Sequence, residues 1–212
     1  LLLEPKEIDA ERGVIKGEWR QRTAQASSRL LEKALPEIYP GSPYGHRMPI
    51  GSMEIVENFK PRQLKDYYKK WYHPHNQCVI VVGDIDLDHM EAQIRSLWSD
   101  VKSPKGAVAF DPPAIPANAS PIASVQTDPE QSASTLSLYI KHPSIADSLD
   151  NTIASLRDEV VRSMVCRMLA ERLTEVENAS ESPILSTAIG DMKFLLSRGQ
   201  QAMILRTPVK KG

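Results

Sequence analysis

The sequence of 212 residues has no long apolar run and almost no excess of either charge. No apolar run approaches the roughly 18 to 20 residues that span a bilayer, and Leu1-Leu2-Leu3 is too short for the core of a signal peptide. Its 26 basic and 27 acidic residues are interspersed and give a formal net charge of −1. This balance argues against nucleic acid or an anionic membrane as a partner. We therefore expect a soluble globular chain that does not bind nucleic acid.

Cysteine is also scarce, with only Cys78 and Cys166. Cys78 lies in an apolar run and Cys166 in an amphipathic segment, which is where a small apolar side chain is usually buried. The sequence therefore favours two buried free thiols over a disulfide. This reading leaves the cellular compartment open.

The spacing of apolar residues and the turn residues predict alternating helices and strands over most of the chain. The predicted helices cover residues 5–35 with a possible break near 24–28, then 52–59, 61–73, 86–98 and 147–177. The predicted strands cover residues 78–82, buried on both faces, and then 122–127, 135–141, 184–196 and 201–207. Met90, Ile94, Leu97 and Trp98 are expected to face inward.

Two proline-rich segments interrupt this pattern. Residues 39–51 hold three prolines and three glycines and predict a long ordered loop. Residues 99–121 hold five prolines and show almost no periodicity, as in a linker between domains. We place a domain boundary near residue 112, which divides the chain into residues 1–111 and 112–212.

Two glutamates on the first predicted helix are the residues most able to carry chemistry. Glu11 and Glu18 are seven residues apart, so they lie within about 20° of each other around a helix and about 10.5 Å apart along it. One carboxylate can then bind a small ion while the other supports a neighbouring ligand. Val14 and Ile15 fall between them, so a buried face would require partners for both acids. Spacing alone is weak evidence for such a site, because a solvated helix with ordinary Glu–Arg pairs is the more common origin of this pattern.

The segment Glu11-Arg12-Gly13-Val14-Ile15-Lys16-Gly17-Glu18-Trp19-Arg20 resembles the part of pitrilysin/insulinase (inverzincin) zinc metallopeptidases that follows their H-x-x-E-H motif by some seventy residues. Later segments resemble the same family in the same order. They are residues 40–45, 50–51, 67–76 and 81–86, with weaker similarity at Glu171-Arg172-Leu173-Thr174-Glu175 and Ser182-Pro183-Ile184-Leu185.

The resemblance implies an α+β fold of the LuxS/mitochondrial-processing-peptidase-like metallohydrolase type. In that fold antiparallel-rich sheets are backed by helices, and domains pair like a clamshell around the substrate. The chain would hold the later part of the first, zinc peptidase domain in residues 1–111 and the opening part of the second, peptidase-like domain in residues 112–212. Glu18 matches the third zinc ligand of the family, and Glu11 matches the acid that helps to orient the site. Tyr44 and its loop, residues 40–51, could lie beside the substrate-binding edge or serve structure alone.

The chain departs from the family at the motif that carries the chemistry. None of its five histidines begins an H-x-x-E-H or H-E-x-x-H sequence, so two zinc ligands and the general base are missing. A catalytic zinc site needs three protein ligands and a water, so Glu18 alone should bind no zinc and the isolated chain should be inactive. His73-Pro74-His75 is interpreted as a loop with exposed imidazoles, and Gly83-Asp84 as a tight turn.

The sequence begins without methionine and enters a helical pattern at once. We therefore expect a fragment of a longer protein, the parent, which would bind zinc and cleave peptides or unfolded polypeptides. Apolar faces left uncovered by the remaining domains predict self-association of the fragment or disorder of its first helix. The resemblance makes a bacterial periplasm or cell envelope plausible.

Two other interpretations stay open. One is a non-catalytic member of the same fold that serves assembly or substrate binding. The other is an unrelated binding module whose helix exposes both glutamates to solvent.

Overall fold

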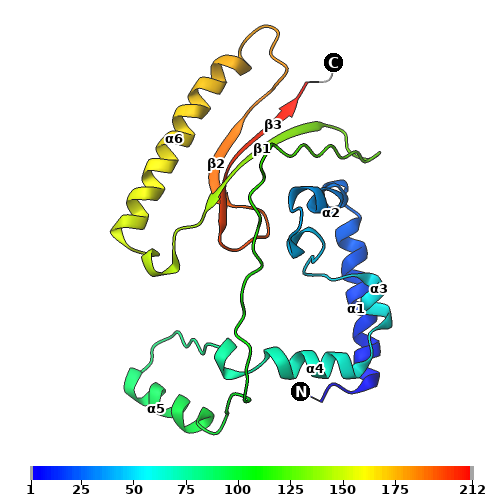
Figure 1. Cartoon of the computed structure of the whole chain (residues 1–212), viewed down its shortest axis with the longest axis vertical. Coiled ribbons are helices and arrows are strands. Elements are labelled where there is room, and N and C mark those ends of the chain that lie inside the picture. Colours follow the sequence, from blue (N-terminus) through cyan, green and yellow to red (C-terminus); the bar gives the residue numbers. More distant parts are fainter. Residues whose placement is uncertain (1, 211–212) are drawn as a thin grey trace. The chain divides into compact units, whose positions relative to one another are not determined.

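The computed structural model describes residues 2–210 and forms two compact units. The first unit comprises Leu1–Trp19 and Ile50–Asp111, and the second comprises Arg20–Pro49 and Pro112–Gly212. Among the described residues, the first unit contains helices only and the second contains a sheet with helices (Figure 1). The combination of helices with an antiparallel sheet confirms the α+β class. No helix in residues 2–210 is long and apolar enough to cross a bilayer.

The helices of the first unit follow the sequence pattern closely. They are α1 (Pro5–Thr23), which continues into the second unit, α3 (Met53–Asn58), α4 (Pro61–Trp71) and α5 (Leu87–Trp98). Asp86 caps α5, where its carboxylate accepts a hydrogen bond from the His89 backbone N–H at 2.8 Å. These helices confirm the predictions for residues 52–59, 61–73 and 86–98.

Residues 78–82 form no strand, so this prediction was wrong. The segment is exposed, with Ile80 at 79% and Val82 at 91% of full exposure. A strand needs a neighbour for its backbone hydrogen bonds, and the described part of the first unit contains no strand to supply one. Leu97 and Trp98 are exposed as well, although Met90 and Ile94 are half-buried. The prediction that four apolar residues of α5 face inward therefore holds for Met90 and Ile94 only.

The two cysteines differ in exposure. Both are free thiols, but Cys78 is exposed and only Cys166 is buried. The predicted burial of Cys78 was therefore wrong, because it depended on the strand that does not form. Burial, followed by the charge of Asp191, raises the pKa of the Cys166 thiol.

We expect a maleimide reagent at pH 7 to modify Cys78 of the 212-residue chain and to leave Cys166 unmodified until the chain is unfolded. Cys78 is open to solvent, whereas Cys166 is shielded and its raised pKa keeps it protonated. Intact-mass measurements over time, with Cys78→Ser and Cys166→Ser variants to assign each site, check this. Equal labelling rates for the two thiols would contradict the burial of Cys166.

The second unit contains α2 (Ala26–Ile38) and a three-stranded antiparallel sheet. Its strands are β1 (Ser134–Pro143), β2 (Ala188–Lys193) and β3 (Gln200–Val209), in the order β1-β3-β2. β1 pairs with β3 from Ser134↔Val209 to Pro143↔Gln200, and β2 pairs with β3 from Ala188↔Arg206 to Lys193↔Gln201. The predicted strands at 135–141, 184–196 and 201–207 are confirmed. The second is shorter than predicted, because β2 covers only Ala188–Lys193. Residues 122–127 form no strand, so that prediction was wrong.

The long helix α6 (Ile153–Glu177) connects β1 to β2 and lies alongside β2 (Figure 1). Thr152 caps it in a capping box, accepting from the Ser155 N–H while the Ser155 hydroxyl accepts from the Thr152 N–H. The helix therefore starts six residues later than predicted, after a short 3₁₀ turn at Asp147–Leu149. Its only buried residue is Cys166. Most of its apolar side chains, such as Ile153 and Met164, are exposed, so the expectation of self-association remains a prediction.

The core of the second unit joins α2 to the β2–β3 hairpin. Leu35, Tyr39, Phe194 and Ala202 form one cluster, each no more than 2% exposed. The Tyr39 hydroxyl donates to the Phe194 carbonyl at 2.8 Å and accepts from the Leu196 N–H at 3.2 Å. Burial raises the pKa of Tyr39. Residues far apart in sequence thus make a tight, hydrogen-bonded contact.

Arg29 stabilises the break between α1 and α2. The break lies at Ala24–Gln25, as predicted, and Arg29 Nη1 donates to the carbonyls of Thr23 and Ala24 at 2.8 and 3.0 Å. Its other nitrogens form a bidentate pair with Asp128 at 2.8 and 2.7 Å. The Asp128 side chain is only 4% exposed. Arg29 therefore ties the end of α1 to the segment that precedes β1.

This pair predicts an acid-dependent loss of stability. The hydrogen bond from Arg29 lowers the pKa of Asp128 from 3.8 to about 2. A depressed folded pKa gives stabilisation that is complete above the unfolded pKa of about 3.9 and is lost as the pH falls towards the folded value. The urea midpoint of the native chain should therefore exceed that of Asp128→Asn by a constant margin above pH 4, and the margin should shrink between pH 4 and about 2. A margin unchanged to pH 2 would contradict this.

Candidate metal-binding face of the first helix

One face of α1 packs within the first unit. Ile8 is buried, and Arg12 and Ile15 are half-buried one and two turns later. This spacing of four and seven residues places all three on the same side of the helix. The packing face of α1 therefore runs through Ile8, Arg12 and Ile15.

Arg12 makes the most extensive contacts on this face. Its guanidinium lies 4.0 Å from the centre of the Phe59 ring and donates to the backbone carbonyls of Val56 and Phe59. Its Nε also donates to Asp9 at 3.0 Å. One turn further along α1, Lys16 pairs with Glu57 at 2.6 Å, and this hydrogen bond lowers the pKa of Glu57. Both basic residues hold α1 against α3.

Glu11 and Glu18 lie on the exposed part of α1, as does Val14 between them. Glu11 is next to Arg12 in sequence and so is rotated by about 100° from it around the helix. The structure thus places both predicted site residues on one helix, with an open face. The two acids therefore do not lie on a buried face of the helix, where each would have required a partner inside the protein.

Residues 2–210 contain no group of three or more His, Cys, Asp or Glu side chains that could hold a metal ion. Zinc in a catalytic site takes three protein ligands, of which one can be a carboxylate. The α1 face therefore fits a part of such a site, one carboxylate ligand and one supporting acid. It does not fit a complete one.

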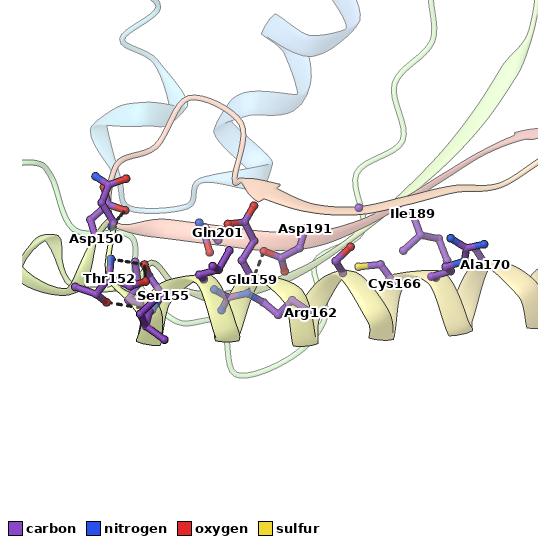
Figure 2. A pocket seen from close by; sticks show the side chains of 17 residues that line it. Asp150, Thr152, Ser155, Glu159, Arg162, Cys166, Ala170, Ile189, Asp191 and Gln201 are labelled. Carbon is purple, nitrogen blue, oxygen red and sulfur yellow. Dashed lines mark hydrogen bonds and ion pairs between the residues drawn. The ribbon is translucent and has the colours of Figure 1, made fainter.

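A second possible site is the groove of about 1030 Å³ between α6 and strands β2 and β3. Figure 2 shows Asp191 near Arg162 in this groove. The Asp191 carboxylate lies 2.8 Å from His142 Nε2 and 3.6 Å from Arg162 Nε, so it ties β1, β2 and α6 together. The neighbouring Cys166 thiol has its pKa raised by burial and by Asp191, which disfavours the reactive thiolate. The arrangement is that of a structural contact.

The loop around Tyr44 packs within the second unit. The Tyr44 hydroxyl accepts from the Arg198 N–H at 3.2 Å, and its ring lies 5.7 Å from that of Tyr39. A Cβ on Gly45 would come within 3.2 Å of Pro36 Cα and of the Tyr39 carbonyl oxygen, so a larger residue would require these backbone atoms to shift. These contacts support the structural interpretation of the loop.

His73 corrects one detail of the sequence interpretation. It is 3% exposed, whereas both imidazoles of His73-Pro74-His75 were expected to be exposed. Its Nε2 lies 3.2 Å from the Asn76 amide nitrogen, which also donates to the carbonyls of Trp71 and Val108 at 3.2 Å. Asn76 therefore contacts both the buried His73 ring and the backbone at Val108.

The family described as "Peptidase M16 inactive domain" matches residues 58–182 of this chain, more than half of its length. The chain belongs to the M16 peptidase family. The matched segment crosses residue 112, so it includes parts of both segments that the sequence assigned to different domains. The M16 family contains the pitrilysin-type zinc proteases, which confirms the family resemblance.

Several zinc proteases of this family are similar to the chain. It is 31% identical over 185 residues to "Probable zinc protease PqqL" of Haemophilus influenzae, and 31% identical over 183 residues to the Escherichia coli protein of the same name. These alignments cover 85% and 86% of the chain but only 19% of either relative. The chain therefore spans about a fifth of the length of these relatives.

Solved structures agree with the M16 assignment. The first half of the periplasmic protease PqqL from Escherichia coli superposes with a TM-score of 0.74 at 27% identity, covering 99% of this chain and 43% of that one. The ferredoxin protease FusC, in complex with Arabidopsis ferredoxin, has a TM-score of 0.69 at 19% identity and covers 98% of this chain and 22% of that one. The latter likeness shows the fold alone. Membership of the M16 family excludes the interpretation as an unrelated binding module.

Sequence reasoning missed Arg12 and Phe59 as the residues that hold the acidic face of this M16 chain in place. The spacing of Ile8, Arg12 and Ile15 could have indicated a packing face that includes the arginine. The Phe59 contact could not be predicted, because the two residues are separated by 47 positions.

Proposed function

We propose that this chain is part of a zinc metalloendopeptidase in which Glu18 is a zinc ligand and Glu11 supports the site. The observation that carries the proposal is the face of α1 on which Glu11 and Glu18 occupy exposed positions seven residues apart, in a chain of the M16 family. The remaining ligands and the general base would come from an H-x-x-E-H motif elsewhere in the parent. Residues 1–111 would belong to the zinc peptidase domain and residues 112–212 to the second, peptidase-like domain.

The proposed chemistry divides between the metal and the protein. When bound, zinc would polarise the peptide carbonyl and lower the pKa of a water molecule. Glu18 would contribute one carboxylate oxygen and negative charge to the metal. Glu11, one heptad earlier on the same face, would accept a hydrogen bond from a neighbouring ligand and fix its orientation. This chain alone, with one ligand and no general base, would be inactive.

Substrates would be peptides or unfolded polypeptide segments, bound by the parent with its remaining domains. The zinc protease names of the relatives, and the ferredoxin bound to FusC, support a protein or peptide substrate. The Escherichia coli protease PqqL is described as periplasmic, which supports a periplasmic or envelope location for the parent of this chain. A charge of −1 with mixed signs offers no basis for nucleic-acid binding.

The second candidate function is that of a non-catalytic subunit that serves assembly or substrate binding. The match to the family described as an inactive domain favours it. The presence of both Glu11 and Glu18 argues for the peptidase, because a subunit that had lost the zinc residues would be expected to have lost these two as well, but it does not decide between the two functions.

Zinc content and cleavage of a quenched peptide, measured for the full-length protein beside the 212-residue chain, test the proposal. The peptidase proposal expects about one zinc per full-length molecule together with cleavage, and neither property in the short chain. A full-length protein without zinc and without cleavage would instead establish the non-catalytic function.

A further inference from the structure

The face of α1 that adjoins the two acids is held against α3 by Arg12 and Lys16, and Arg12 makes the more extensive contacts. We propose that Arg12 is a positioning residue, which fixes the rotation of α1 and so the direction in which Glu11 and Glu18 project. This inference rests on the proposed function, because the direction of the two carboxylates matters only if they belong to a metal site.

The first support is the completeness of the Arg12 contacts. Nε, Nη1 and Nη2 all donate hydrogen bonds, to the Asp9 carboxylate and to the carbonyls of Val56 and Phe59. The flat face of the guanidinium covers the Phe59 ring at 4.0 Å. The side chain is only 15% exposed. A planar group held by its edges and its face has little rotational freedom.

The second support is what Arg12 binds. Val56 lies in the last turn of α3, where helix carbonyls have no partner within the helix, and Phe59 is the residue that ends the helix. The guanidinium supplies donors to these carbonyls. Arg12 therefore caps α3 as well as anchoring α1, so the position of one helix depends on the other.

The third support is the weakness of α1 by itself. Gly13 and Gly17 lie inside the helix, and a Cβ at either position would meet nothing within 4 Å. Glycine without a packing contact lowers helix stability relative to alanine. Both glycines lie among the six residues between Glu11 and Glu18. The geometry of that segment therefore depends on an external anchor, which Arg12 provides one residue after Glu11.

The inference is tested in the full-length protein with Arg12→Met and Arg12→Lys. Arg62→Met is the matched control, because Arg62 is an arginine of the same unit whose side chain is 91% exposed. Zinc affinity is measured by competition with a chelator, and zinc stoichiometry is measured at saturating zinc. The values of kcat and KM are measured with a quenched peptide. Glu18→Gln is measured in parallel.

We expect Arg12→Met to weaken zinc affinity about 10- to 100-fold, the range found for residues that orient metal ligands. We also expect kcat to fall with little change in KM. Arg12→Lys should recover part of the affinity, because an ammonium keeps the charge and can reach one carbonyl, and Arg62→Met should match the native protein. A purely structural role would lower the fraction of molecules that bind zinc without changing the affinity of those that do.

The outcomes separate this inference from the proposed function. Native zinc affinity in Arg12→Met, with zinc lost in Glu18→Gln, would overturn the role of Arg12 and leave the peptidase function intact. Zinc retained in Glu18→Gln would overturn both. If Arg12→Met does not fold, Phe59→Leu replaces it, since this change keeps the hydrogen bonds and removes only the ring. It should weaken zinc affinity about two- to fivefold, and unchanged affinity would count against the inference.

Discussion

Replacing Glu18 with glutamine in the full-length protein is expected to weaken zinc affinity by more than about 100-fold and to abolish measurable peptide cleavage. Changes to residues that only orient a zinc ligand already cost about 10- to 100-fold, and loss of a ligand should cost more. Glutamine keeps the size of the side chain but removes its negative charge. Because Glu18 lies on an exposed helix face, the substitution should leave the fold unchanged. Chelator competition and a quenched-peptide assay measure the two effects.

The same helix offers matched controls for this experiment. Glu7→Gln makes the same change at an exposed position of α1, one turn before Glu11, and should leave zinc affinity unchanged. Glu11→Gln should give an intermediate loss of about 10- to 100-fold, as expected for an acid that supports a ligand. Equal losses from Glu7→Gln and Glu18→Gln would show a general charge effect and contradict the assignment of Glu18.

Replacing Phe194 with alanine is expected to destabilise the 212-residue chain by about 3 to 5 kcal/mol, the usual cost of truncating a buried aromatic residue. Phe194 is 2% exposed, and its ring contacts Tyr39 and Tyr139 at centroid distances of 5.1 and 5.6 Å. The substitution leaves a cavity where α2 meets the β2–β3 hairpin. Urea unfolding followed by circular dichroism measures the change.

Two further variants show that the effect comes from the core cluster. Tyr39→Phe keeps the ring but removes two hydrogen bonds, one to the Phe194 carbonyl and one from the Leu196 N–H. It should cost about 1 to 3 kcal/mol, because the Phe194 carbonyl still accepts from the Ser197 hydroxyl at 2.6 Å whereas the Leu196 N–H loses its acceptor. Val125→Ala truncates an apolar side chain that is 85% exposed and should change stability by less than about 0.5 kcal/mol. A Phe194→Ala loss no larger than that of Val125→Ala would contradict the assignment of this core.

The helices were predictable because their determinants are local. Pro61 at the start of α4 and Asp86 as the cap of α5 were recognised from a few neighbouring residues, whereas the start of α6 was placed six residues too early and its cap, Thr152, was missed. The α1–α2 break was also predicted, although its stabilisation by Arg29 involves Asp128, which is 99 residues away.

The strand predictions succeeded only where a partner strand is present. β1, β2 and β3 pair with one another, whereas residues 78–82 and 122–127 have equally suitable compositions and form no strand. A β-branched run specifies an extended backbone but does not supply the hydrogen-bonding neighbour that a strand requires. The burial of Cys78 failed with the strand for the same reason.

For the candidate site, the sequence by itself determined which residues share a face, because helical geometry places Glu11 and Glu18 in line whatever surrounds them. Their motif also led to the M16 family. Only the tertiary structure decided that this face is exposed and that Arg12 contacts Val56 and Phe59 beside it. The same holds for the contact of Tyr39 with Phe194, 155 residues away. Helical periodicity is a property of neighbouring residues, whereas burial and anchoring depend on what the folded chain brings from a distance.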